Sequence, residues 1–176
     1  MQVNFEPLGD PEAVAGCLGE LRDRAADLWS AFPVFADAVR EIERGRFATG
    51  GYGQWQPLAA ATIASKAAAG YDTNRILYAT GRLEESVVGF TGDSVIHVGP
   101  DEVFVGTSTP YAHWHQTGGF RLHASGAGWP PKRTIYEFSD AERLALLDVI
   151  AGFLFEGEAG AAAGLGAVGD AALGAA

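Results

Sequence analysis

Two histidines placed two positions apart, His113 and His115, are the side chains of this sequence best suited to do chemistry. On an extended strand such residues share a face, and neutral imidazole is a common zinc ligand, so the pair could begin a site for metal-dependent hydrolysis. Zinc needs three or four converging ligands, and only His97, His123 and the remote Cys17 could supply the others. We therefore predict no bound metal or other cofactor, and keep a histidine-dependent metal hydrolase as the alternative function.

Other catalytic patterns are missing from the sequence. It contains no Gly-x-Ser-x-Gly segment and no phosphate-binding glycine loop, although it has 24 glycines. The acidic pairs Glu84-Glu85 and Asp101-Glu102 fall in turns or at expected strand starts, where solvated carboxylates are ordinary. The chain is predicted not to be an enzyme.

Large aromatic residues lie on glycine-rich segments of the chain. Rigid aromatic side chains dominate the energy of many protein interfaces, so as a set these residues favour contacts between subunits. For any one of them, packing onto its own domain is an equally good interpretation. The residues concerned are Tyr52, Trp55, Tyr111, Trp114 and Trp129.

The charge of the chain argues against tight DNA binding. The 176 residues include 22 acidic and 12 basic ones, which gives a net charge of −10, whereas proteins that hold phosphates need clustered Lys and Arg. An acidic surface could instead line a channel through which DNA slides without being held.

No apolar run is long enough for a membrane span, and the start lacks the features of a secretion signal. The single Cys17 is expected to be buried on a helix.

The first half of the sequence predicts helices. Asp10 and Pro11 are a typical N-cap and first helical residue, and a second helix is expected from near Pro33 to near Phe47. Joined at residues 30–32, the two would form a helical hairpin over 10–48, followed by a loop and short helix over 49–70. The apolar stripe expected to face inward on the first helix consists of Val14, Leu18, Leu21, Ala25 and Leu28.

The second half predicts strands and then a capped helix. Three runs rich in Val, Ile and Phe, at 83–90, 94–99 and 102–107, indicate an antiparallel meander over 83–107, and 133–138 could add a fourth strand. Ser139 and Glu142 form a capping-box pattern that begins a helix over 139–155. The stripe expected to face inward on that helix consists of Leu144, Leu147, Ile150, Ala151 and Leu154.

Together these elements predict one α+β domain over 1–158, in which an antiparallel β-meander of three to four strands packs against the N-terminal helical hairpin and the C-terminal helix. Residues 159–176 are almost wholly Gly and Ala. Such a segment buries little apolar area, so it is expected to be mobile by itself or to order against a neighbouring subunit.

Taken in order, a series of short motifs resembles the phage virion morphogenesis and tail completion family, typified by Mu-like and P2-like phages. The resemblance spans about residues 47–154. It departs from the family pattern at the usual Pro-x-Arg segment, which reads Pro130-Pro131-Lys132-Arg133 here, and at an insert-like stretch over 121–128. The matching residues are Phe47, Gly50-Gly51, Trp55-Gln56-Pro57-Leu58, Thr62, Lys66, Ile76-Leu77, Thr80-Gly81-Arg82-Leu83, Ser86, Val105-Gly106-Thr107, Tyr111-Ala112, His115-Gln116, Gly118, Pro130-Pro131 and Arg133.

The resemblance implies a structural virion protein that is assembled in the host cytoplasm and has no catalytic activity. Identical subunits, expected to number six, would form a ring at the head-proximal end of the tail, contacting the tail tube protein and the head–tail connector or stopper and lining the DNA channel. A toxin-system component from a prophage remnant is a third possibility.

The expected residue roles follow from the same motifs. Leu77, Leu83 and Tyr111 are expected in the core, and His115 and Gln116 are expected to hold a loop by hydrogen bonding. The candidates for subunit or partner contacts are Tyr52, Trp55, Leu58, Lys66, Trp114, Trp129 and Arg133. The candidates for structural positions are Gly81, Leu83, Gly106, Tyr111, His115, Gln116, Gly118 and Pro131.

Overall fold

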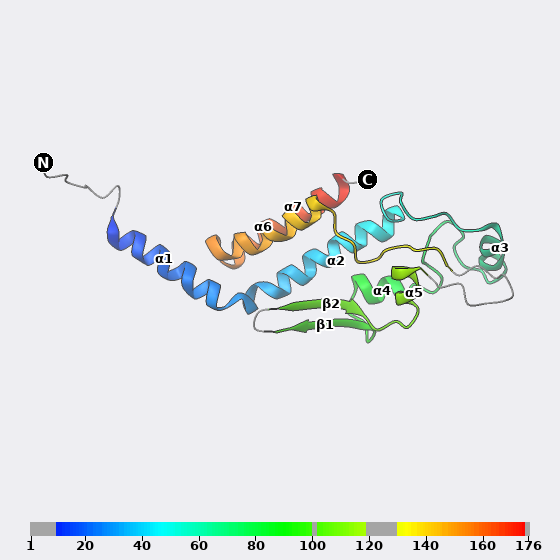
Figure 1. The fold of residues 1–176 in the computed structure, drawn as a ribbon, viewed down its shortest axis with the longest axis horizontal. Helices are drawn as coiled ribbons and strands as arrows, with labels where there is room; N and C mark the ends of the chain where they lie inside the picture. The colour runs from blue at the N-terminus through cyan, green and yellow to red at the C-terminus, as the bar shows by residue number, and fades with distance from the viewer. Residues whose placement is uncertain (1–9, 100–101, 119–129, 175–176) are drawn as a thin grey trace, which may run out of the picture.

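A computed structural model describes residues 10–99, 102–118 and 130–174, and within them the predicted α+β class is confirmed (Figure 1). The elements in chain order are α1 (Pro11–Ala26), the short 3-10 helix η1 (Leu28–Ala31), α2 (Phe32–Thr49), α3 (Ala60–Ala68), α4 (Arg82–Val88), β1 (Ser94–Val98), β2 (Val103–Thr107), α5 (Ala112–Thr117), α6 (Asp140–Glu156) and α7 (Glu158–Gly174).

Helix α2 is the central element of the fold. Helices α6 and α7 pack along one side of it, and α4 and the two strands lie on the other (Figure 1). Its buried Ala38, Val39 and Ile42 recur at helical spacing, as expected for a helix covered on more than one side. The helix ends where Gly50 adopts a left-handed φ of 66°, a conformation that glycine reaches without steric cost.

The β-sheet is smaller than predicted. Among the described residues it has two antiparallel strands, β1 and β2, which pair Ile96 with Val105. The run 83–90, predicted as a strand, is helix α4, in which Leu83, Ser86 and Val87 are buried on one face. Glu84 and Glu85 in its first turn favour a helix because carboxylates stabilise the positive end of the helix dipole. Residues 133–138 form no strand either.

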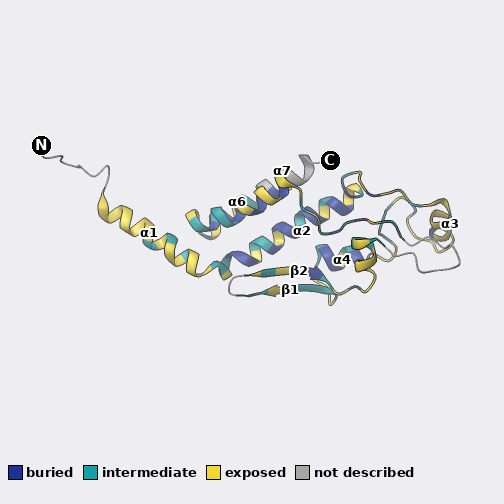
Figure 2. Ribbon diagram, viewed as in Figure 1, coloured by how far each residue is buried: buried dark blue, intermediate teal, exposed yellow. Residues whose placement is uncertain are grey.

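Helix α1 begins as predicted, because the Asp10 side chain accepts a hydrogen bond from the backbone N–H of Glu12 at 3.0 Å. The predicted hairpin is wrong, since α1 points away from α2 instead of folding back along it (Figure 1). No residue of α1 is buried, and Figure 2 shows the helix as largely exposed. Cys17, expected in a core, is exposed as well.

Helix α6 has the predicted capping box, with reciprocal hydrogen bonds between Ser139 and Glu142. The predicted inward stripe is wrong at Leu144 and Leu147, which remain 63% and 62% exposed, whereas Ile150 does pack against the core. The helix is apolar on most sides, so periodicity alone did not distinguish the covered face. The face that packs against α2 and α7 carries instead Ala145, Leu146, Val149 and Phe153.

The Gly/Ala-rich segment forms helix α7 and packs on its own chain, against α6 and α2. Small residues make this packing possible. A Cβ added at Gly160 would lie 2.1 Å from the carbonyl oxygen of Gly152, and one at Gly164 would lie 2.8 Å from the Cα of Val149. The lack of large side chains led us to expect mobility from the sequence. In the structure, the same lack allows the backbones of α7 and α6 to come into close contact.

A buried ionic cluster lies between α2 and α6. Arg46 approaches Glu43 and Glu142, each at 3.3 Å, and all three side chains are buried. Burial raises the pKa of Glu43 to about 8, partly offset by the charge of Arg46 and reinforced by that of Glu142. The guanidinium of Arg46 is thus paired with two carboxylates, and Glu43 tends to stay protonated at neutral pH.

Candidate functional site

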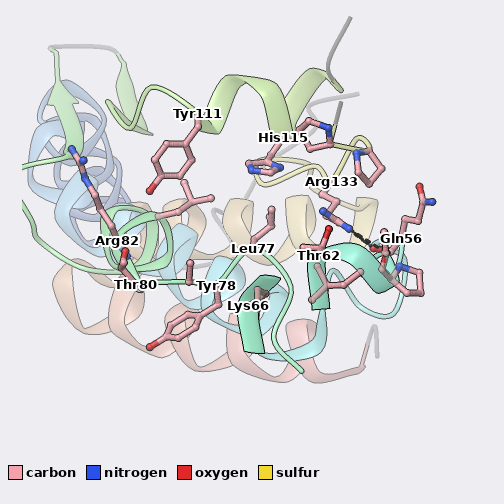
Figure 3. A pocket seen from close by; sticks show the side chains of 18 of the residues that line it. Gln56, Thr62, Lys66, Leu77, Tyr78, Thr80, Arg82, Tyr111, His115 and Arg133 are labelled. Atoms are coloured by element: carbon pink, nitrogen blue, oxygen red, sulfur yellow. Dashed lines mark hydrogen bonds between the residues drawn. The ribbon is translucent and has the colours of Figure 1, made fainter. Parts of the chain in front are cut away.

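A pocket of about 750 Å³ is lined by the side chains drawn in Figure 3. Its walls come from four separate parts of the chain: the segment around α3, the segment leading into α4, helix α5, and residues 130–133. The described residues that line it are Gln56, Pro57, Leu58, Ala59, Ala61, Thr62, Lys66, Leu77, Tyr78, Ala79, Thr80, Gly81, Arg82, Leu83, Tyr111, His115, Pro130, Pro131 and Arg133.

Arg133 joins two walls of the pocket. Its Nε and Nη2 atoms donate hydrogen bonds to the carbonyl of Gln56 at 3.0 and 2.8 Å, and Nη2 also reaches the carbonyl of Pro57 at 3.3 Å (Figure 3). Burial holds the pKa of Arg133 below its usual range, but a guanidinium stays charged at neutral pH. The residue therefore brings a buried positive charge to the pocket.

Lys66 joins α3 to the segment that leads into α4. Its Nζ donates to the carbonyl of Arg75 at 2.6 Å, and the residue is only 9% exposed. Its neighbour along the pocket wall, Leu77, has a φ of 57°, which is rare and strained for a residue with a side chain. Strained backbone of this kind is concentrated at binding and catalytic sites in proteins.

Gln116 links α5 to the segment before α6. Its side-chain carbonyl accepts hydrogen bonds from the backbone N–H groups of Ile135 and Tyr136 at 2.7 and 3.1 Å, and its amide donates to the carbonyl of Tyr136 at 3.0 Å. This clamp sets the position of α5, from which Tyr111 and His115 reach the pocket (Figure 3).

The pocket is positive in a protein that is acidic overall. Its lining includes Lys66, Arg82 and Arg133, and none of the described lining residues carries a carboxylate. Arg82 forms an ion pair with Asp93 at 2.6 Å, outside the lining. Across the described parts of the chain, neither Lys66 nor Arg133 has an acidic partner.

The two histidines that suggested metal chemistry lie on helix α5 instead of a strand. Residues two apart point to different sides of a helix, so His113 and His115 cannot bind one ion together in this arrangement. Over the ranges that the structure describes, no group of three or more His, Cys, Asp or Glu residues could hold a metal, and His123 lies outside those ranges. Burial, and then the charge of Arg133, lowers the pKa of His115.

The residues predicted for subunit or partner contacts fall in different environments. Leu58, Lys66 and Arg133 line the pocket, whereas Trp114 is 39% exposed on α5 and Trp129 lies outside the described residues. Tyr52 is partly buried and donates a hydrogen bond to the carbonyl of Ile42 at 3.1 Å. These assignments stay predictions.

Trp55, also predicted at an interface, lies inside the chain's own core at 5% exposure. It packs edge-on against Phe47, with ring centroids 5.4 Å apart. Gly51 makes room for it, because a Cβ there would lie 2.3 Å from the indole ring. Leu83 is buried as expected for a core position, but Tyr111 is 39% exposed at the pocket rim.

Several pocket residues were not among the predicted contact residues, notably Tyr78, Thr80 and Arg82. Thr80 and Arg82 belong to the motif Thr80-Gly81-Arg82-Leu83. This motif is part of the ordered series that carries the family resemblance, and that membership could have identified both residues. Most of that series, which the sequence spreads over about half its length, converges on this pocket. Such convergence is expected of a binding surface that a family shares.

The family model for the phage virion morphogenesis family matches residues 10–154. The chain belongs to the phage virion morphogenesis family. The match includes α1 and the whole of the pocket lining. No curated protein and no solved structure matches the chain.

Membership of the phage virion morphogenesis family makes this protein a bacteriophage component with a structural role in virion assembly. The family is one of structural and assembly proteins. Within the described residues, no helix is both long and apolar enough to cross a bilayer.

Proposed function

We propose that this virion morphogenesis protein forms a ring at the head-proximal end of a phage tail, where it joins the tail to the head. In this role identical subunits, six in the expected ring, contact one another, the tail tube protein and the head–tail connector or stopper. The observation that carries the proposal is the exposure of helix α1, which lies within the family match and buries none of its residues.

Helix α1 needs a surface to pack against. It has 16 residues, little more than the length of about 12–15 below which isolated helices are marginal in water. Gly16 and Gly19 weaken it further, by about 1 kcal/mol each relative to Ala. Its apolar Val14 and Leu18 are 53% and 60% exposed. Contact with another subunit would supply the missing packing.

The attachment of α1 to its own chain leaves that apolar side open. Arg24, near its C-terminal end, donates to the carbonyls of Leu154 and Phe155 at 3.1 and 2.9 Å. This anchor sets the direction in which the helix projects (Figure 1) while Val14 and Leu18 stay uncovered. A helix held at one end in this way is suited to reach a neighbouring copy.

The exposed face of α6 is the surface we assign to the neighbouring α1. It carries Leu144 and Leu147, and near its end Phe155, which is 70% exposed. Because the donor helix and the receiving face are different surfaces of one chain, the contact is head-to-tail, and such contacts close into rings when the rotation between copies allows. Six copies of a chain with a net charge of −10 would carry −60 formal charges, which suits a channel that passes DNA without holding it.

The experiment that tests the ring is to charge the apolar side of α1. The double variant Val14→Glu with Leu18→Glu is expected to be a folded monomer by light scattering and circular dichroism, whereas the wild type forms a closed oligomer. Gly16→Glu is the matched control, since it adds a carboxylate on the opposite side of the same helix, where nothing lies within 4 Å. A wild type that stays monomeric at all concentrations, or a double variant that still forms rings, rules the proposal out.

A further inference from the structure

The positive pocket has a composition that suits a particular class of ligand. Its described lining combines three cations with prolines, Leu58 and the half-exposed Tyr111, and it lacks carboxylates. Arg82 is paired with Asp93, but Lys66 and Arg133 have no acidic partner in the described parts of the chain and are both buried. Buried charge of this kind is costly to build, and a ligand that offsets it would lower the cost.

Two of these cations have unused hydrogen-bonding capacity. The Lys66 ammonium has three N–H donors, and in the described structure only one is used, on the carbonyl of Arg75. Arg133 spends its Nε and Nη2 on backbone carbonyls, and its Nη1 has no partner among the described residues. Neutral carbonyls position these side chains without neutralising them, so both charges remain available to a ligand.

The size and lining of the pocket favour an extended ligand over a compact ion. It measures about 750 Å³, which is far more than a single phosphate or carboxylate fills, and its walls carry Pro57, Pro130 and Pro131 with Tyr111 at the rim. Grooves lined by aromatic and apolar residues commonly bind extended, proline-rich segments, whose low conformational entropy reduces the cost of binding.

We propose that this pocket binds an acidic, extended segment of a partner virion protein, with carboxylates of the segment meeting Lys66, Arg82 and Arg133. The inference rests on the proposed assembly function, because it treats the pocket as the place where a second kind of virion protein is held. It is independent of the contact between α1 and α6, since no residue of either helix lines the pocket.

A fluorescein-labelled peptide of alternating Pro and Glu is the probe, because proline keeps it extended. Fluorescence polarisation with the full chain is expected to show saturable binding that weakens as salt is raised. The corresponding peptide of alternating Pro and Gln is expected to bind at least about tenfold more weakly, a difference of about 1.4 kcal/mol. Equal binding of the two peptides, or no binding of either, overturns the inference.

Pocket variants locate the binding. Lys66→Met is expected to weaken binding of the Glu peptide about tenfold or more, because the residue is buried, and Lys66→Arg is expected to retain most of it. Arg82→Gln, on a more exposed residue, should cost about two- to fivefold. Arg44→Gln removes an exposed arginine outside the pocket and serves as the control. An equal loss with Arg44→Gln overturns the inference.

Two further measurements separate the other possible occupants. A short single-stranded DNA that binds more tightly than the peptide, and loses binding in the same variants, would assign the pocket to nucleic acid instead. The double α1 variant should bind the peptide as the wild type does. Binding of the peptide to this variant alone, and not to rings, would mean that a second copy fills the pocket.

Loss of peptide binding with intact rings counts against this inference only, whereas loss of rings with intact peptide binding counts only against the proposed ring.

Discussion

The indole Nε1 of Trp55 donates a hydrogen bond of 3.0 Å to the carbonyl of Thr134, joining segments 79 residues apart. The bond connects the aromatic loop after α2 to the segment before α6. Because Trp55 is also 5% exposed and packed on Phe47, it stabilises the fold of the single subunit.

We expect Trp55→Ala to lower the free energy of unfolding by about 3–5 kcal/mol, as for other large-to-small changes in a core. Trp55→Phe should cost less, because it keeps one aromatic ring in the core and loses the hydrogen bond and only part of the buried volume. Urea denaturation measures both. A folded Trp55→Ala subunit with wild-type stability that fails only to assemble would show that this residue acts at an interface after all.

Glu43 predicts an unusual pH dependence. Its pKa is raised to about 8 in the folded state, against a usual value of 4.5, so between these pH values the unfolded state releases a proton that the folded state keeps. Ionisation therefore favours unfolding, and stability falls as the pH rises through this window. Glu43→Gln should be similar to the wild type near pH 4 and more stable by roughly 2–4 kcal/mol at pH 8. Thermal melts across this range test it, and a constant difference between the two proteins contradicts the pKa assignment.

Two glycines on different helices should respond in opposite ways to alanine. Gly16 on α1 has nothing within 4 Å of an added Cβ, so Gly16→Ala should stabilise the helix by about 0.5–1 kcal/mol. At Gly160 the added Cβ would lie 2.1 Å from the carbonyl oxygen of Gly152, so Gly160→Ala should force α7 away from α6 and destabilise the protein. Melting temperatures of the two variants give the comparison. Equal effects would mean that α7 does not pack closely on α6.

Cys17 offers a direct probe of the surface of α1. It is the only cysteine of the chain and is exposed in the single subunit. If a neighbouring copy covers α1, the thiol should react with a maleimide more slowly in the assembled ring than in the monomeric Val14→Glu, Leu18→Glu variant. Denatured samples of both proteins should react at the same rate and provide the reference. An unchanged rate on assembly would place the subunit contact elsewhere.

Local signals in the sequence were sufficient for several elements. The Asp10-Pro11 start of α1 and the capping box of Ser139 and Glu142 appear in the structure, because each depends on groups within one turn of the chain. Helix α2 ends at Thr49, close to the end expected near Phe47. The ordered motifs from residue 47 onward were likewise sufficient to identify the family, which the match over 10–154 confirms.

Elements that pack against residues distant in the sequence were predicted less well. Val87 and Val88 favour a strand by composition, yet the segment is helical because the spacing of Leu83, Ser86 and Val87 lets one helix face pack in the core. Helix α6 has apolar residues on most sides, so only the positions of α2 and α7 decide which of them are covered. The Gly/Ala segment forms α7 where its small residues meet the backbone of α6 at Gly152 and Val149.

The sequence by itself determined the family, the α+β class, the N-caps of α1 and α6 and the acidic character of the protein, since these depend on composition, short spacing and ordered motifs. Only the tertiary structure decided that α1 is left uncovered, that Trp55 belongs to the core, and that Lys66, Arg82 and Arg133 meet in one pocket. The physical reason is that burial and charge density depend on the distances between segments that folding brings together from far apart in the chain.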